Sequence, residues 1–316
     1  MVQDSKIEWT DDTFNPVIGC AKVAAGCQHC YAERMSARIV ARKWGNEAAG
    51  GVRVRTSESY WNDPIRWNRK AQKSGIRRRV FCASWADVFE DFSGPIVWRD
   101  GRPVINRWSG ALYTMNDVRA DLFRLIDRTP WLDWLLLTKR PENIPRMWAT
   151  WPAGSSPDGS DGHGSGARHL KNVWLGTSIA VQADADANIR ALQKCRELSP
   201  VLFLSCEPLL GPVDLKLGSV GIDWVIAGGE SGPRSRPMHP AWPRSLRDQC
   251  RSHGVPFFFK QWGEWAIKTH GTSRDQPVRF GSEMFYMSPV GKAVAGRMLD
   301  GVTHDEMPRF SLEVRQ

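Results

Sequence analysis

Short apolar runs recur along the chain, and each is followed by a polar or glycine-rich turn and then by a stretch with helical periodicity. A run of four to six apolar residues ahead of a loop is typical of a buried parallel strand. A shorter run at 14–20 predicts the first strand. The other runs predict six strands, within 79–89, 134–141, 172–180, 201–210, 223–232 and 255–263.

The stretches between these runs predict amphipathic helices. Ile189, Leu192 and Cys195 fall at helical spacing in one stretch, and Gly254 is suited to end another. The predicted helices span 31–45, 116–128, 183–198 and 240–254.

Alternating strands and helices indicate βα units and a parallel sheet. The sequence therefore predicts an α/β fold, a partial (β/α) barrel of about six or seven parallel strands. No G-x-G-x-x-G follows the first predicted strand, which argues against a Rossmann fold. We expect the barrel to span 1–262, with a flexible Gly/Ser loop at 153–167 in which the lone His163 is solvated. An irregular C-terminal extension, 263–316, would pack on the barrel.

Composition agrees with a folded domain and bears on location. The 316 residues are 41% hydrophobic and 24% charged, which excludes a disordered chain, a collagen-like fibre and a coiled coil. No apolar run is long enough to cross a membrane, and the N-terminus lacks the apolar core of a signal peptide. We therefore expect a soluble, cytoplasmic protein without membrane attachment.

The charge balance favours a polyanionic partner. Lys and Arg number 43 against 34 Asp and Glu, a net charge of +9. Arginine binds phosphate in bidentate fashion, and the 16 Trp offer stacking surface, although most of them should be packing residues. A basic enzyme without a nucleic-acid partner is the alternative.

Three of the seven cysteines, Cys20, Cys27 and Cys30, lie close together in GCAKVAAGCQHCYAE, after the first predicted strand and before a helix. Disulfides are unusual in a reducing compartment, where clustered cysteines more often bind metal. Three thiolates can hold a [4Fe–4S] cluster with one open iron, to which a small molecule could bind through amino and carboxylate groups. The alternatives are a Cys₃His zinc site that includes His29, and a redox C-x-x-C that would not need Cys20.

The chain resembles a bacteriophage-associated family of the radical S-adenosylmethionine type, which is distantly similar to spore photoproduct lyase. The resemblance covers nearly the whole chain, to the ending VGKAVAGRMLDGVTHDEMP. It rests on SKIEWTDDTFNPVIGC, GCQHCYAER, LLLTKRPENI, VWLGTSIA, FLSCEPLLGPVDL, WVIAGGESGPRSRPMHPAW and VPFFFKQWGEW. It implies a partial barrel, a [4Fe–4S] cluster and S-adenosylmethionine, but no substrate. The first gap between cysteines is wider than in the common C-x₃-C-x₂-C pattern, and His29 stands where an aromatic residue is usual.

The resemblance also implies cofactor residues at strand ends. By similarity to spore photoproduct lyase-like enzymes, Ser84, Lys139 and Ser178 would hold the amino-acid part of S-adenosylmethionine. Lys139 supplies a cation for the methionine carboxylate, and the serines supply compact donors and acceptors. Each could instead be a strand-end residue that caps a helix.

Further candidates follow the remaining strands. Cys82, if it faces the barrel lumen, could give a hydrogen atom to a substrate radical, although a buried small hydrophobe is the alternative. Glu207 could orient substrate, as could Asp87, although SCEP could equally be a rigid turn. Two runs also end strands: Gly228, Gly229 and Glu230, which we assign to the cofactor ribose or the substrate, and Lys260, Gln261 and Trp262, where substrate could approach. Three cysteines should belong to the core, namely Cys195, Cys206 and Cys250.

Together these features predict a radical S-adenosylmethionine enzyme that modifies or repairs a nucleic acid or nucleobase. Its electron donor would be of the flavodoxin or ferredoxin type. The alternative is a non-catalytic zinc- or cluster-bearing nucleic-acid-binding phage protein. A methyl- or sulfur-transferring enzyme would need further cysteines, and no second compact group is visible.

Overall fold

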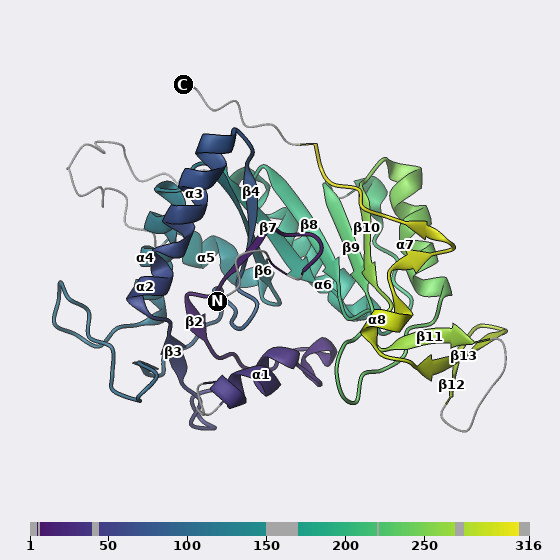
Figure 1. The fold of residues 1–316 in the computed structure, drawn as a ribbon, viewed down its shortest axis with the longest axis horizontal. Helices are drawn as coiled ribbons and strands as arrows, with labels where there is room; N and C mark the ends of the chain where they lie inside the picture. Colours follow the sequence, from purple (N-terminus) through teal and green to yellow (C-terminus); the bar gives the residue numbers. More distant parts are fainter. Residues whose placement is uncertain are drawn as a thin grey trace.

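The computed structural model describes residues 5, 7–39, 44–149, 170–219, 221–268 and 275–309. Its centre is a seven-stranded parallel sheet curled into half a barrel, with the strand order β1-β4-β6-β7-β8-β9-β10 (Figure 1). This arrangement confirms the predicted α/β partial barrel. The strands are β1 (Asp12–Phe14), β4 (Arg78–Cys82), β6 (Leu132–Thr138), β7 (Val173–Ser178), β8 (Val201–Cys206), β9 (Trp224–Gly228) and β10 (Phe257–Gln261).

Helices connect the parallel strands and cover one face of the sheet. In α7, Leu246 and Cys250 are buried one turn apart, and Gly254 ends the helix with a φ of +65°. The helices are α1 (Tyr31–Ile39), α2 (Glu58–Trp61), α3 (Asp63–Ser74), α4 (Met115–Asp127), α5 (Ile144–Ala149), α6 (Gln182–Gln193), α7 (Ala241–His253) and α8 (Lys292–Ala295). Single 3-10 turns are η1 (Ala25–Cys27), η2 (Pro141–Asn143), η3 (Arg196–Leu198) and η4 (Leu217–Ser219).

The first strand differs from the prediction of one run over 14–20. β1 ends at Phe14, and β2 (Val17–Ile18) belongs to a separate sheet of order β2-β3-β5. The partners in this sheet are β3 (Arg53–Arg55) and β5 (Ile96–Val97). Pro16 lies between β1 and β2 and has no N–H with which to continue the ladder, which explains the break.

The two faces of the half-barrel carry different cores. Alternate strand residues such as Leu136 and Leu204 join helix residues such as Leu122 in the largest buried cluster. The residues between them point into the lumen, where a second cluster contains Trp9, Trp224 and no helix residue. Side-chain alternation along each strand therefore decides which residues can meet a bound molecule.

Cys82 lies on the helix side of this division. Its neighbour Phe81 belongs to the lumen cluster, whereas the Cys82 side chain is 0% exposed among the helix-side residues. The suggested catalytic role of Cys82, which required its thiol to face the lumen, is therefore wrong, and the alternative of a buried small hydrophobe is correct. Three more cysteines, Cys195, Cys206 and Cys250, are buried in the same cluster, as predicted.

Aromatic rings fill the deep part of the lumen. Trp224 meets Trp9 and Trp174 edge to face, with ring centroids 6.2 Å apart in both pairs. Phe203 packs on Gly176 of the neighbouring strand, and a Cβ at Gly176 would come within 2.3 Å of that ring. The lumen is thus a packed core at depth, and only its mouth can receive a ligand.

The prediction that the C-terminal extension is irregular is wrong, because the described part of the segment after Gly263 contains regular strands that its sequence pattern does not indicate. A three-stranded antiparallel sheet of order β11-β13-β12 lies below α8 at the right of Figure 1. The chain then forms a hairpin and runs antiparallel to β10, where Asp305 pairs with Phe258. The strands are β11 (Trp265–Lys268), β12 (Gln276–Phe280), β13 (Glu283–Pro289), β14 (Met298–Leu299) and β15 (Val302–Thr303).

Two expectations concern loops and membranes. The predicted Gly/Ser loop at 153–167, with His163, lies outside the described residues. Among the helices that the structure does describe, none combines the length and apolarity required for a membrane span.

The packing of Phe203 on Gly176 predicts that Gly176→Ala destabilises the fold. The added methyl overpacks the lumen, and we expect the free energy of unfolding to fall by about 1–3 kcal/mol in urea titrations. Adding Phe203→Leu should recover part of the loss. Gly211→Ala is the matched control, because a Cβ there meets no atom within 4 Å. Equal stability of the two alanine variants would contradict this account.

Candidate functional site

The mouth of the half-barrel lies at the carboxyl ends of its strands, where parallel α/β folds bind ligands. Ser178 and Ser205 are register partners on neighbouring strands. Just above them, the Lys260 Nζ lies 3.4 Å from Oε1 of Glu207, and Ser205 donates to the other Glu207 oxygen at 3.3 Å. A mostly buried ion pair therefore lies at the mouth, above an aromatic floor.

A glycine makes this pair possible. Glu207 directly follows β8, and Lys260 lies in β10. Strand β9 lies between these two strands in the sheet. A Cβ at Gly228 would lie 2.7 Å from Glu207 Oε1. The role of Gly228 that the structure supports is thus to leave room for a carboxylate that reaches across its strand.

Gly229 is also required for packing. A Cβ there would lie 2.0 Å from the Trp262 carbonyl oxygen, and its N–H donates to Gln261 O at 2.9 Å. Gly229 therefore allows β9 and β10 to approach at the mouth. Of the candidates in β10, Lys260 faces the mouth, whereas the Gln261 side chain donates to the Ser231 hydroxyl at 2.6 Å.

The three candidate cysteines lie on a loop over this mouth, which we call the cysteine loop (residues 20–30). A Cβ at Gly26 would lie 3.3 Å from both Ala180 and Pro208, so the loop packs directly on the segments after β7 and β8. Cys20 and Cys30 are half-buried, Cys27 is buried, and all three thiols are free. The cysteine loop leads into α1.

One end of the cysteine loop is tied down by a buried charge network around Arg140. The Arg140 guanidinium bonds Asp87 at 2.9 Å and Glu90 at 3.2 Å, and it also donates to Ala21 O at 2.9 Å. Glu90 accepts from Ala21 N at 2.9 Å and pairs with fully buried Arg53 at 2.7 Å. Segments more than 100 residues apart are thereby joined around Ala21.

Arg140 also contacts a candidate ligand, since its Nη1 lies 3.7 Å from Cys20 Sγ. Burial, with Glu90 and Asp87 nearby, raises the pKa of Cys20 to about 12, and Arg140 opposes that rise. Burial disfavours the charged guanidinium, but Asp87, Cys20 and Glu90 outweigh it and raise the pKa of Arg140. Arg140 is therefore the cation that a thiolate at Cys20 would face.

The other end of the cysteine loop is held through Glu230. Arg236 bonds both Glu230 oxygens, at 2.6 and 2.9 Å, and His29 approaches the same carboxylate at 3.3 Å. Arg236 also donates to Gln28 and to Ala25 O. Burial works against ionisation of Glu230, but the hydrogen bonds from Arg236 outweigh it and lower the pKa of this carboxyl.

These contacts change the interpretation of two acids. The sequence suggests that Glu230 contacts the cofactor ribose or substrate, yet both its oxygens bind residues that hold the cysteine loop. Asp87 likewise accepts from Thr138 at 2.7 Å and from Lys139 N at 3.1 Å in addition to Arg140. Both carboxylates position the loop, and Glu207 remains the acid at the mouth.

The three candidates for the methionine part of the cofactor have different surroundings. Ser178 is buried at the end of β7 beside Ser205. Lys139 is half-buried, and within the described ranges its ammonium has no ion-pair partner. Ser84 exchanges hydrogen bonds with Asn15, and Ser84 O accepts from Tyr31 at 3.1 Å. Because β4 ends at Cys82, strand alternation does not extend to Ser84.

Sequence reasoning missed Arg140, Glu90, Arg53 and Arg236. The signal for Arg140 was its place beside Lys139 after an apolar strand, and that for Arg236 was its place six residues after Glu230. Neither position indicates that its guanidinium pairs with a buried carboxylate.

The donor set can be compared with what a metal cofactor needs. No three His, Cys, Asp or Glu side chains among the described residues are arranged as a metal-binding group. The cysteine loop nevertheless carries three free thiols, the ligand type and number of a [4Fe–4S] cluster with one open iron. The chemistry of the donors fits such a cluster.

Comparison with known proteins gives one family. The chain matches the family described as "Protein of unknown function (DUF5131)" over residues 4–106 and 92–308, and it belongs to this family. No curated protein and no solved structure matches the chain.

The Arg140 network predicts that Arg140→Met is strongly destabilising. Removing the guanidinium leaves Asp87 and Glu90 buried without their shared cation, and we expect a loss of about 3–5 kcal/mol in the free energy of unfolding. Arg102→Met is the matched control, since Arg102 pairs with Asp100 in an 80% exposed position. Equal losses in the two variants, measured by urea denaturation, would refute the role of the network.

The Glu230 contacts predict a pH-dependent difference between the wild type and Glu230→Gln. Because the folded pKa lies below the unfolded value, the carboxylate stabilises the fold above the unfolded pKa. That contribution is lost as pH falls through the folded pKa, where Glu230 becomes neutral. Thermal unfolding midpoints should therefore differ near pH ~7, and the difference should shrink as pH falls below the unfolded carboxyl pKa of ~4.3. A difference that persists unchanged in acid would contradict the assignment.

Proposed function

We propose that this protein is a radical S-adenosylmethionine enzyme whose [4Fe–4S] cluster is held by Cys20, Cys27 and Cys30. The observation that supports the proposal is a loop with three free thiols, tied at both ends across the mouth of a parallel half-barrel. Two charge networks and the packing of Gly26 hold the loop there.

Such a cluster, when bound, supplies one electron for cleavage of S-adenosylmethionine to methionine and a 5′-deoxyadenosyl radical that takes hydrogen from a substrate. The residues of the chain bind and orient. Lys139, whose ammonium lacks an ion-pair partner in the described part of the chain, offers a cation to the methionine carboxylate. Ser84, which follows β4, and Ser178, at the end of β7, add compact hydrogen-bonding groups on either side of β6.

The substrate would enter from the mouth and meet Glu207 and Lys260. Their ion pair offers an acceptor and a donor above an apolar floor that excludes water. Cys82 has no part in this chemistry, because it is buried on the helix side. The net charge of +9 favours a nucleic acid or nucleobase substrate, and the electron donor would be a flavodoxin- or ferredoxin-type protein.

Anaerobic reconstitution with iron and sulfide tests the proposal. The wild-type chain should take up about four irons and, after reduction with S-adenosylmethionine, release 5′-deoxyadenosine. Cys20→Ala, Cys27→Ala and Cys30→Ala should each lose most of the iron and the product. Cys195→Ala, which removes a thiol from the core, should retain both.

Two results would reject the proposal. Binding of one zinc and no iron would support the alternative, a non-catalytic zinc-bearing nucleic-acid-binding protein. Iron uptake that is unchanged in all three loop variants would show that the cysteine loop is not the cluster site.

A further inference from the structure

Two exposed arginines, Arg34 and Arg234, lie at the loop that follows β9. Arg34, in α1, lays its guanidinium on Gly232, where a Cβ would come within 2.7 Å of an Arg34 nitrogen. Gly232 also has a φ of +96°, so both its backbone and the space above it favour glycine. Arg234 follows two residues later, exposed and with a left-handed φ of +64°. The Arg34 guanidinium therefore lies against the loop that carries Arg234.

The acids near these arginines already have other partners. Glu33 pairs with Lys22 at 2.7 Å, and Glu230 pairs with Arg236. Glu264 accepts from the Gly232 N–H at 2.8 Å. Across the ranges that the structure describes, neither Arg34 nor Arg234 forms an ion pair, so their charges are available to an anion from solution.

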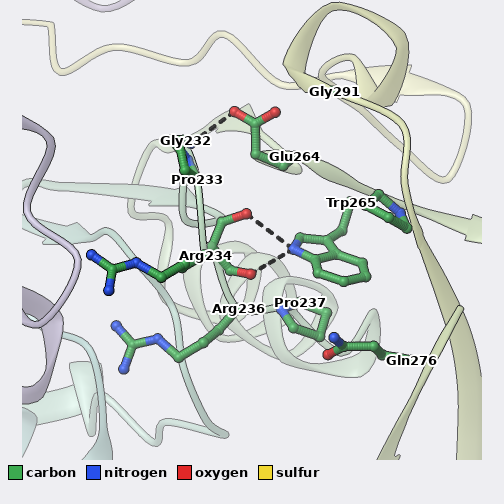
Figure 2. A pocket seen from close by; sticks show the side chains of 11 residues that line it. Gly232, Pro233, Arg234, Arg236, Pro237, Glu264, Trp265, Gln276 and Gly291 are labelled. Atoms are coloured by element: carbon green, nitrogen blue, oxygen red, sulfur yellow. Dashed lines mark hydrogen bonds between the residues drawn. The ribbon is translucent and has the colours of Figure 1, made fainter. Parts of the chain in front are cut away.

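A cavity of about 610 Å³ opens beside Arg234. Figure 2 shows the Arg234 and Arg236 side chains extending on one side, with Glu264, Trp265 and Gln276 around the rest of the cavity. The Trp265 indole is fixed by hydrogen bonds to Ser235, at 2.9 and 3.1 Å. The volume suits a ligand of nucleotide size. The Gln276 amide and the Glu264 carboxylate offer hydrogen-bond partners to a base or sugar.

We propose that Arg34, Arg234 and the adjoining cavity, which together we call the rim, bind single-stranded nucleic acid. A phosphodiester would lie on Arg34 and Arg234, and the attached nucleoside would lie in the cavity. The chemistry is bidentate recognition of phosphate, within a protein of net charge +9. A single strand is required because a duplex keeps its bases stacked and cannot place one in a side cavity. Single-stranded nucleic acid would be the substrate class of the proposed radical enzyme, so its role as a substrate rests on that proposed function. The binding itself does not need the cluster.

The test is fluorescence anisotropy with a labelled single-stranded DNA of about a dozen nucleotides, without reductant or S-adenosylmethionine. Arg34→Gln and Arg234→Gln should each weaken binding about tenfold at low salt. Each should also reduce the slope of log affinity against log salt by about 0.7, because one phosphate contact is lost.

Arg102→Gln is the control, since it removes the same charge from an exposed residue that pairs with Asp100. If Arg102→Gln weakens binding as much as the other two variants, the effect is net charge alone and the proposal is overturned. Duplex DNA that binds as tightly as the single strand, or inorganic phosphate that competes as well as an unlabelled strand, would also overturn it.

The iron content of each variant separates the two proposals. Arg34→Gln and Arg234→Gln should take up iron like the wild type. If the wild type binds no iron but the two arginine variants still weaken DNA binding, only the radical function is rejected. If the wild type binds iron and releases 5′-deoxyadenosine but the arginine variants bind DNA like the wild type, only the nucleic-acid rim is rejected.

Discussion

The arrangement of the mouth depends on one buried cation, Arg140, shared by Asp87 and Glu90. Charges removed from water stabilise a fold only when every partner is in place, so this network has few alternative geometries. It fixes the turn after β6, the segment after β4 and the start of the cysteine loop relative to one another. The thiols therefore belong to a region whose framework forms together with the barrel.

The fold was predictable because its signals are local. The parallel strands from β6 to β10 are mostly apolar runs buried on both faces, and α7 has buried residues at one-turn spacing and a glycine at its end. α3 escaped detection because it is rich in Arg and Lys and buries only Pro64, Trp67, Asn68 and Ala71. A sparse stripe of this kind is hard to distinguish from a solvated loop.

The site was less predictable because its signals are not local. The sequence identifies Lys139, Ser178 and Glu207 as strand-end residues, and the structure indeed has them there. It does not reveal which face a strand residue occupies, and for this reason Cys82 stayed a candidate for the lumen although its side chain lies on the helix side. Nor does it reveal ion-pair partners, so Glu230 resembled a ligand-binding acid while its oxygens are occupied by Arg236 and His29.

The strand-like segment near residue 305 lies along β10, at the open side of the half-barrel. Phe259 N–H donates to His304 O at 3.0 Å, and Trp224 Nε1 donates to Glu306 O at 2.9 Å. An uncovered edge strand invites pairing with another polypeptide. Because synthesis proceeds from the N-terminus, β10 is made before the segment that shields its edge, and until that segment docks the nascent barrel exposes main-chain groups on which intermolecular sheet growth could begin.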